Sequence, residues 1–196
     1  YEKAIEAFNK YLKELQKDPD AWLNLGICYY SIKKYEKALE SFDNCIKIKK
    51  DSADAWYQRG LALSGLKKTE DAIDSFNKAI KIDPLYKDAY FNKAMMCNSL
   101  KRYEEAVETY DAYLKMEPND IEAWKDKANA LISMEKFEEA LEAYDKATKI
   151  DSKDFSAIFW KAKILYKLEK LEEALVAINT ALDITVDDKM ALGIKK

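Results

Sequence analysis

A period of 34 residues runs through the chain and constrains its fold more than any other feature. One column along this period is alanine throughout, and two others are mainly aromatic. The alanine column is Ala4, Ala38, Ala72, Ala106, Ala140 and Ala174. The first aromatic column is Trp22, Trp56, Tyr90 and Trp124, continued by Ile158 and Leu192. The second is Phe8, Phe42, Phe76, Tyr110 and Tyr144, continued by Ile178. A fixed period of this length is typical of stacked helical repeats.

The motif within each period is as specific as the period itself. Its first occurrence reads Trp22-x2-Leu25-Gly26-x2-Tyr29, followed by Ala38-x3-Phe42. Over its whole length the chain therefore resembles the tetratricopeptide repeat (TPR) family. The resemblance implies an all-α fold, a right-handed superhelical α-solenoid of antiparallel helix pairs. A long coiled coil is a poor alternative, because heptads would not return Trp and Ala at this spacing.

The repeat register divides the chain without a linker. We expect a half repeat at 1–18, a stub of a further repeat at 189–196, and a single TPR solenoid domain over 1–196. The five complete repeats are 19–52, 53–86, 87–120, 121–154 and 155–188. Each is long enough for two helices of about 14 residues and a short turn. Because the pattern begins in mid-repeat at Tyr1, we expect the chain to be a piece of a longer protein.

Small residues should let the two helices of a repeat approach closely. Gly26 and Gly60 occupy the expected contact position, which Ala94, Ala128 and Ala162 fill in the later repeats. The alanine column serves the same contact from the second helix. We therefore interpret the Trp and Phe columns as structural core and not as a ligand box.

The sequence offers little catalytic or metal-binding chemistry. It contains no histidine, which removes the usual general base and the commonest transition-metal ligand. Cys28, Cys45 and Cys97 lack the Cys-x-x-Cys spacing of metal and redox sites, so we interpret them as buried thiols. We predict a protein that is not an enzyme and needs no cofactor.

Charge and hydropathy restrict the classes of partner and the cellular location that we expect for this chain. The formal net charge is −3, which argues against nucleic-acid binding through a general basic field. No apolar run approaches the ~20 residues of a membrane span, and no secretory start is present. We expect a soluble, cytoplasmic protein with no nucleic-acid partner and no membrane contact.

Some charged residues stand four apart on the second helices. The pairs are Asp43 with Lys47, Asp111 with Lys115, and Asp145 with Lys149. This spacing predicts ion pairs along the surface of single helices.

In the TPR family, one face of each first helix lines a concave groove. Positions 2, 5, 9 and 12 of each repeat form that face here. The resemblance implies that the groove residues are Leu23, Ile27, Tyr30, Tyr57, Leu61, Phe91, Met95, Lys125, Asn129, Phe159, Lys163 and Tyr166, and that the rim is Asp20, Asp54, Asp88 and Glu122. The groove predicts a peptide partner with apolar anchors and some positive charge. The alternative is that neighbouring repeats pack on these residues.

Some family members hold acidic chaperone tails in a carboxylate clamp, and that clamp is incomplete here. Lys125 and Asn129 match its first pair, but Trp160 stands where the next repeat should supply Asn. We therefore predict a non-enzymatic scaffold that binds a protein or peptide partner in the groove, without this clamp.

The leading alternative function is a structural module that assembles with its own copies. The half repeat carries Phe8 and Tyr11 on a face that has no preceding helix to cover it, and a solenoid normally caps its ends. Exposed ends of this kind predict head-to-tail self-association.

Overall fold

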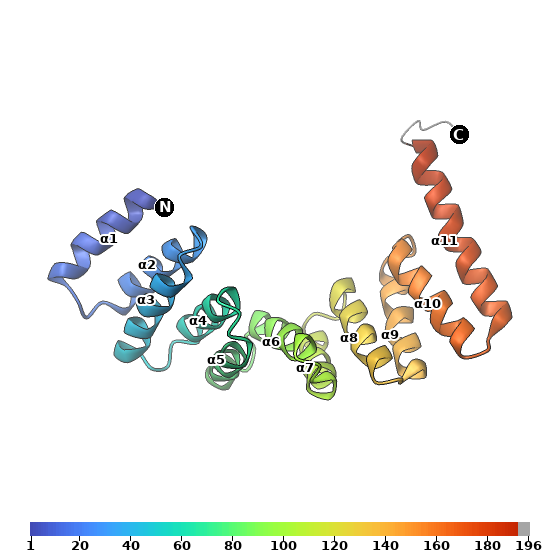
Figure 1. Ribbon diagram of the computed structural model, residues 1–196, viewed down its shortest axis with the longest axis horizontal. Coiled ribbons are helices and arrows are strands. Elements are labelled where there is room, and N and C mark those ends of the chain that lie inside the picture. Colours follow the sequence, from blue (N-terminus) through green and yellow to red (C-terminus); the bar gives the residue numbers. More distant parts are fainter. Residues whose placement is uncertain (192–196) are drawn as a thin grey trace. The chain divides into compact units, whose positions relative to one another are not determined.

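The computed structural model describes the backbone of residues 1–191 and the side chains of residues 1–184. The described residues form eleven α-helices and no strand, which confirms the all-α fold class (Figure 1). The half repeat forms α1 (Glu2–Glu14). The first helices of the complete repeats, here called A helices, are α2 (Pro19–Ser31), α4 (Ala53–Gly65), α6 (Lys87–Ser99), α8 (Ile121–Ser133) and α10 (Phe155–Lys167). The second, or B, helices are α3 (Tyr35–Ile48), α5 (Thr69–Ile82), α7 (Tyr103–Met116), α9 (Phe137–Ile150) and α11 (Leu171–Ala191).

Backbone contacts gather the chain into two compact units. Unit 1 comprises Tyr1–Lys101 and contains α1 to α6, and unit 2 comprises Arg102–Lys196 and begins with α7. Within each unit, helices that are consecutive in sequence pack against each other (Figure 1). The unit boundary falls between the A helix and the B helix of the repeat 87–120. The single domain and the right-handed superhelix stay predictions.

The same turn joins the A helix to the B helix in all five repeats. One residue of each turn has a left-handed backbone, with φ between 59° and 61°, namely Lys33, Lys67, Lys101, Glu135 and Glu169. In the first repeat, the Lys34 N–H donates to the Tyr29 carbonyl at 2.9 Å and the Lys33 N–H donates to the Tyr30 carbonyl at 2.8 Å. This pair of bonds is the Schellman motif that closes many helices. Glycine usually occupies its left-handed position, because a side chain costs energy there.

Most A helices begin at a side-chain cap. The carboxylates of Asp18, Asp120 and Asp154 and the hydroxyl of Ser52 accept backbone N–H groups of the first turn. These bonds satisfy donors that have no partner inside the helix. α6 is the exception, because Tyr86 precedes it and makes no side-chain cap bond.

The Trp column ties each corner between repeats to the A helix that follows. The indole N–H groups of Trp22, Trp56 and Trp124 donate to backbone carbonyls six residues earlier, at 2.8, 3.0 and 2.9 Å. These rings are half-buried and not fully enclosed. Their role is structural, as predicted. In addition to packing between helices, the indole rings fix the backbone of the corner that precedes each A helix.

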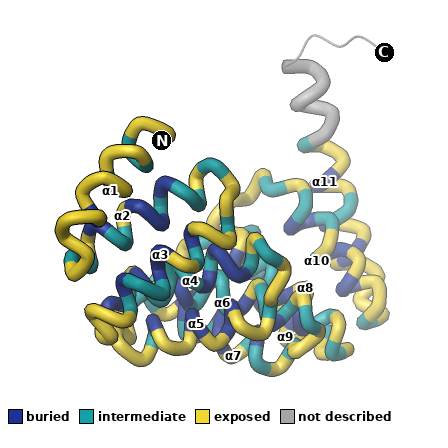
Figure 2. Tube along the Cα trace, turned by 60° about the vertical axis from the view of Figure 1, so that its left-hand side comes forward, coloured by how far each residue is buried: buried dark blue, intermediate teal, exposed yellow. Residues whose placement is uncertain are grey.

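The closest approach of A and B helices occurs where the sequence predicts it. A Cβ atom added to Gly60 would lie 2.5 Å from the buried ring of Phe76, and one added to Gly26 would overlap Phe42 in the same way. Ala38, Ala72, Ala106 and Ala140 of the alanine column are fully buried. Figure 2 shows buried residues along the inner faces of the helices, whereas α1 is mostly exposed.

The predicted ion pairs within single B helices are wrong. Asp43 binds Arg59 at 2.8 Å, Asp111 binds Lys127 at 2.5 Å, and Asp145 binds Lys161 at 2.7 Å. In each case the cation lies on the next A helix, 16 residues further on. The B-helix carboxylate faces that neighbouring helix, so these pairs link consecutive repeats.

The last B helix is longer than the others. α11 has 21 residues where α9 has 14, and it continues through the corner expected before 189. This differs from the predicted start of a new A helix at 189–196, of which 192–196 lie outside the described residues. Two earlier corners carry Pro84 and Pro118, whereas 183–188 contain neither proline nor glycine to end the helix.

Candidate functional site

In the first repeat, the predicted groove residues are half-buried. Leu23, Ile27 and Tyr30 pack against a buried cluster that includes Phe42 of α3 and Ala62 of α4. The ring of Tyr30 also lies 5.5 Å from that of Tyr35. These side chains therefore support the packing of the next A helix while part of their surface stays accessible.

Tyr57 is bound more tightly into the contact between repeats. Its ring lies 5.8 Å from Phe76 and 5.0 Å from Tyr86, and its hydroxyl accepts a hydrogen bond from Asn92 of α6 at 3.3 Å. Burial, reinforced by the charge of Asp88, raises the pKa of Tyr57 to about 12. The alternative interpretation, in which neighbouring repeats pack on these residues, therefore describes Tyr57 well.

The rest of the predicted unit 1 groove is more mixed. Leu61 packs with the buried cluster around Phe76, Phe91 is half-buried, and Met95 is exposed. The rim carboxylates Asp20, Asp54 and Asp88 are exposed. Asp54 accepts a hydrogen bond from the Tyr86 hydroxyl at 2.8 Å, so this rim residue also joins the two ends of its repeat.

In unit 2, the two residues that match part of a carboxylate clamp already have partners. Lys125 donates to Glu122 at 2.6 Å and to Asp154 at 3.0 Å. Burial alone would lower the pKa of Lys125, but these two bonds outweigh it and raise the pKa. The side-chain oxygen of Asn129 accepts a bond from the Tyr144 hydroxyl at 2.7 Å. The structure thus engages both residues in contacts that hold unit 2 together.

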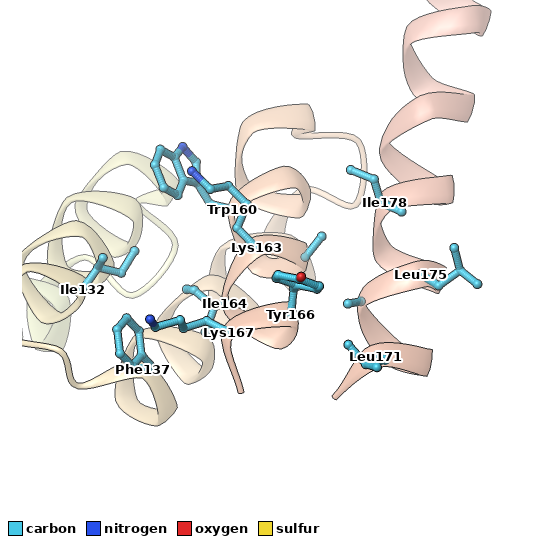
Figure 3. A pocket seen from close by; sticks show the side chains of 12 residues that line it. Ile132, Phe137, Trp160, Lys163, Ile164, Tyr166, Lys167, Leu171, Leu175 and Ile178 are labelled. Atoms are coloured by element: carbon cyan, nitrogen blue, oxygen red, sulfur yellow. The ribbon is translucent and has the colours of Figure 1, made fainter. Parts of the chain in front are cut away.

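A hollow with a volume of about 760 Å³ lies over α10 in unit 2. Residues of α8 and α9 line one side and residues of α11 line the other, as Figure 3 shows. We call it the α10 pocket, and its lining is Ile132, Phe137, Trp160, Ala162, Lys163, Ile164, Tyr166, Lys167, Leu171, Ala174, Leu175 and Ile178. Tyr166 is 70% exposed and Leu175 is 60% exposed, so much of this apolar surface is accessible.

Two lysines stand against aromatic rings in the α10 pocket. The Lys163 ammonium lies 3.9 Å from the centroid of the Trp160 ring and 5.9 Å from that of Phe159. The Lys167 ammonium lies 5.7 Å from the ring centroid of Phe137. Such cation–π contacts hold a charge beside an apolar wall.

The structure brings only some of the predicted groove residues to the α10 pocket. Lys163 and Tyr166 line it, and Phe159 contacts Lys163. The sequence prediction missed Trp160, Lys167 and the three residues contributed by α11 beyond the alanine column, Leu171, Leu175 and Ile178.

A signal for two of the missed residues is present in the repeat columns. The column of Trp160 otherwise carries Asn24, Gln58, Asn92 and Asp126. The column of Lys167 otherwise carries Ser31, Gly65, Ser99 and Ser133. A side chain that breaks its own column is not required by the repeat packing, and such departures indicate a local, special role.

No metal or redox site is evident in the described part of the chain. No group of three or more His, Cys, Asp or Glu there could hold a metal ion. Cys45 is buried, and burial raises the pKa of its thiol to about 11, which disfavours the reactive thiolate. Among the described helices, none has the length and apolar character needed to cross a membrane.

Comparison with known families agrees with the repeat geometry. The tetratricopeptide repeat model matches 19–52 and 53–86, and a model of subunit 3 of the anaphase-promoting complex, or cyclosome, matches 85–181. The chain belongs to the tetratricopeptide-repeat family. TPR proteins are protein-interaction scaffolds and are generally not enzymes. No curated protein matches the sequence significantly.

Several solved TPR structures have a similar fold. YrrB, described as a TPR protein with an unusual peptide-binding site, is 24% identical with a TM-score of 0.81, covering 96% of this chain and 97% of YrrB. A MamA structure is 28% identical with a TM-score of 0.72, covering 76% of this chain and 81% of MamA. The C-terminal part of a TPR protein from Cytophaga hutchinsonii is 16% identical with a TM-score of 0.85, covering 96% of this chain and 75% of that chain.

Proposed function

We propose that this TPR chain is a non-enzymatic scaffold that binds a peptide segment of a partner protein on the faces of its A helices. The α10 pocket is the observation that carries the proposal. Its volume of about 760 Å³ falls within the ~300–1,000 Å³ typical of ligand sites. Its exposed side chains Tyr166, Leu171 and Leu175 form an apolar surface of the kind that marks interaction sites.

Unit 1 contributes a second surface in this proposal. Leu23, Ile27 and Tyr30 keep part of their surface accessible next to the exposed carboxylate of Asp20. Because these side chains also support repeat packing, we assign them a smaller share of the binding energy than the α10 pocket. The exposed rim Asp20, Asp54 and Asp88 favours partner residues with positive charge there.

Selection from a displayed random peptide library tests the proposal. The full chain should enrich peptides, and the double variant Tyr166→Ala with Leu171→Ala should lose most of that enrichment. Both residues are exposed, so the variant should keep the helical content and melting temperature of the parent. Leu182→Ala is the matched control, because this exposed apolar residue of α11 does not line the pocket.

The proposal fails if no peptide enriches, or if enriched peptides bind the double variant as well as the parent. Enrichment that depends instead on Leu23 and Ile27 would move the principal site to unit 1.

A self-assembly module is the second candidate, and α11 favours it. Val176 is 67% exposed, in a column that otherwise carries Glu40, Asp74, Glu108 and Glu142. At the other end of the chain, Tyr11 of α1 and Leu15, which follows α1 directly, are exposed. An exposed apolar residue in an otherwise acidic column is a natural contact for a second copy.

The N-terminal face is less open than the sequence predicts. Phe8 packs against a cluster formed by Leu12, Ala21 and Leu25, so α2 covers part of it. The Tyr11 hydroxyl donates to Asp18, the cap of α2, at 2.9 Å. A head-to-tail contact would therefore use Tyr11 and Leu15 more than Phe8.

Sedimentation equilibrium over a wide concentration range separates the two functions. Self-assembly requires a mass that rises with concentration and returns to that of a monomer in Val176→Glu, which restores the acidic column. A parent chain that stays monomeric throughout would exclude this second candidate and leave peptide binding intact.

A further inference from the structure

We propose that the partner segment held in the α10 pocket is an acidic stretch of polypeptide that presents one bulky apolar side chain. This inference rests on the proposed function and specifies the chemistry of the partner at that site. It differs from the positively charged partner that the acidic rim favours in unit 1.

The pocket has an apolar floor and apolar walls. Ala162 and Ile164 are buried, and together with half-buried Ile132 and Ile178 they offer no polar group to a ligand. Burying a large apolar side chain there removes apolar surface of both molecules from water. The same surface provides no hydrogen-bond partner for a buried polar side chain, which would therefore be disfavoured.

The charged groups that line the pocket are both cationic. Lys163 and Lys167 are exposed and lie four residues apart, one turn along the same face of α10. Neither makes an ion pair with a described residue, and no carboxylate lines the pocket. Two like charges at this spacing repel each other, so an anion between them is favoured.

The half-buried lysines of unit 2, by contrast, have carboxylate partners. Lys125, Lys127 and Lys161 are each paired with carboxylates, at 2.5–3.0 Å. Glu172 and Glu173 of α11 line a different hollow, which also contains Lys161. These half-buried lysines thus have carboxylate partners, whereas Lys163 and Lys167 lie beside the apolar pocket without one.

Departures from the repeat converge on the same pocket. Trp160 replaces an amide or carboxylate column, Lys167 replaces a column of small residues, and Lys163 replaces a column that is apolar in the first three repeats. All three lie on α10 and line the pocket. Because repeat packing requires none of them, binding explains their coincidence better than folding does.

The pocket shape favours a peptide over a small amphiphile. Four helices, α8 to α11, contribute residues to the lining, so the hollow lies between separate helices (Figure 3). A polypeptide can place one anchor over α10 while its flanking acidic residues reach Lys163 and Lys167. A fatty acid offers the same apolar and anionic chemistry in a smaller molecule, so the experiment includes one.

Fluorescence anisotropy with three labelled peptides tests the inference. The first has a central Trp-Leu pair flanked by Asp and Glu, the second replaces every acid by Lys, and the third replaces Trp-Leu by Ala-Ala. Only the first should bind measurably, and binding should weaken as salt screens the lysines. Lys163→Gln with Lys167→Gln should weaken it by roughly tenfold or more, and Trp160→Asn, which restores the column, by a similar factor.

Lys146→Gln with Lys149→Gln is the matched control. It removes the same charge from exposed positions of α9 that do not line the pocket, and it should leave binding unchanged. Circular dichroism melts of all variants should match the parent, because Trp160 and the substituted lysines are exposed.

The inference is overturned if the lysine variants bind the acidic peptide as tightly as the parent, or if the basic peptide binds better. It is also overturned if lauric acid binds in a lysine-dependent manner while the acidic peptide does not. Library peptides that are neutral or basic and require Tyr166 would uphold the proposed function but overturn this inference. A library that yields no peptide at all overturns both.

Discussion

Tyr30 in unit 1 and Tyr166 in unit 2 occupy the same repeat position but have different environments. Tyr30 is half-buried against Tyr35 and a cluster that includes Ala62 of the next A helix. Tyr166 is 70% exposed, and no further A helix follows α11 among the described residues. The comparison teaches that the same groove position contributes to packing where a neighbouring A helix covers it and is exposed where none of the described helices does.

The two units also differ at the contact between A and B helices. In unit 1, Gly26 and Gly60 stand against the rings of Phe42 and Phe76. In the column of Gly60, unit 2 has Ala128, and in the column of Phe76 it has Tyr144, whose hydroxyl donates to Asn129 of α8. The glycine and the ring of unit 1 meet by close approach, whereas the tyrosine of unit 2 also donates a hydrogen bond at this position. Elsewhere along the same helix pair of unit 1, Arg59 donates to the Ser75 hydroxyl at 2.7 Å.

The largest expected effect tests that close approach. Gly60→Leu should destabilise the chain by about 3 kcal/mol or more, because even a Cβ at this position would overlap the buried ring of Phe76. Hydrogen exchange should show α4 and α5 losing protection while α8 and α9 keep theirs. Asn77→Leu, on the exposed face of α5, is the control and should change stability little. Equal losses in the two variants would contradict the Gly–Phe contact.

A matched pair of substitutions tests the contrast between the tyrosines. Tyr30→Ala should lower the free energy of unfolding by about 2 kcal/mol, because it removes half-buried surface between repeats. Tyr166→Ala should change it by less than about 0.5 kcal/mol, because the side chain is mostly exposed. Urea unfolding of the full chain measures both. Similar losses would show that the two positions do not differ as described.

The third prediction concerns Asp154, the N-cap of α10, whose electrostatic contribution to stability lies within unit 2. Burial favours a higher pKa for Asp154, but bonds from the Ala157 N–H, Lys125 and Ser156 hold that pKa below its ordinary value. Asp154→Ala should cost about 1–2 kcal/mol at neutral pH through loss of the cap and the Lys125 bond.

The pH dependence of this loss follows from the lowered pKa. The carboxylate contributes fully above the ordinary carboxylate pKa, and its contribution disappears as the pH falls through the folded-state pKa. The stability difference between the parent and Asp154→Ala should therefore shrink in acid. Ser152→Ala, in the same corner but exposed, serves as the control. A difference that grows in acid would contradict the bonding of Asp154.

The smallest expected effect concerns a feature that the units share. Lys67→Gly in unit 1 and Glu169→Gly in unit 2 should each stabilise the chain by about 0.5 kcal/mol, because both residues have a left-handed backbone. Lys68→Gly should give no gain, since the φ of Lys68 is −91°. Thermal unfolding of the three variants is the measurement. A gain in only one unit would show that the turns are not equivalent.

Much of the fold could be predicted because helix signals act over short distances along the chain. Asp120 and Asp154 mark helix starts, and Gly60 marks the close helix contact, without knowledge of any distant residue. The groove prediction was less complete, because it placed residues by their shared column. Trp160 and Lys167 depart from their columns and therefore fell outside it.

The sequence by itself determined the helices, their 34-residue register and the small residues at their contacts, because periodicity relates residues within one or two turns. Only the tertiary structure decided which partner each charged or half-buried residue meets. Asp43 lies one turn from Lys47 on its own helix, yet it binds Arg59 of the next one, because repeat stacking turns that face toward its neighbour. The same stacking covers Tyr30 and leaves Tyr166 exposed, so the position of a residue within the stack decides whether it is packed or accessible.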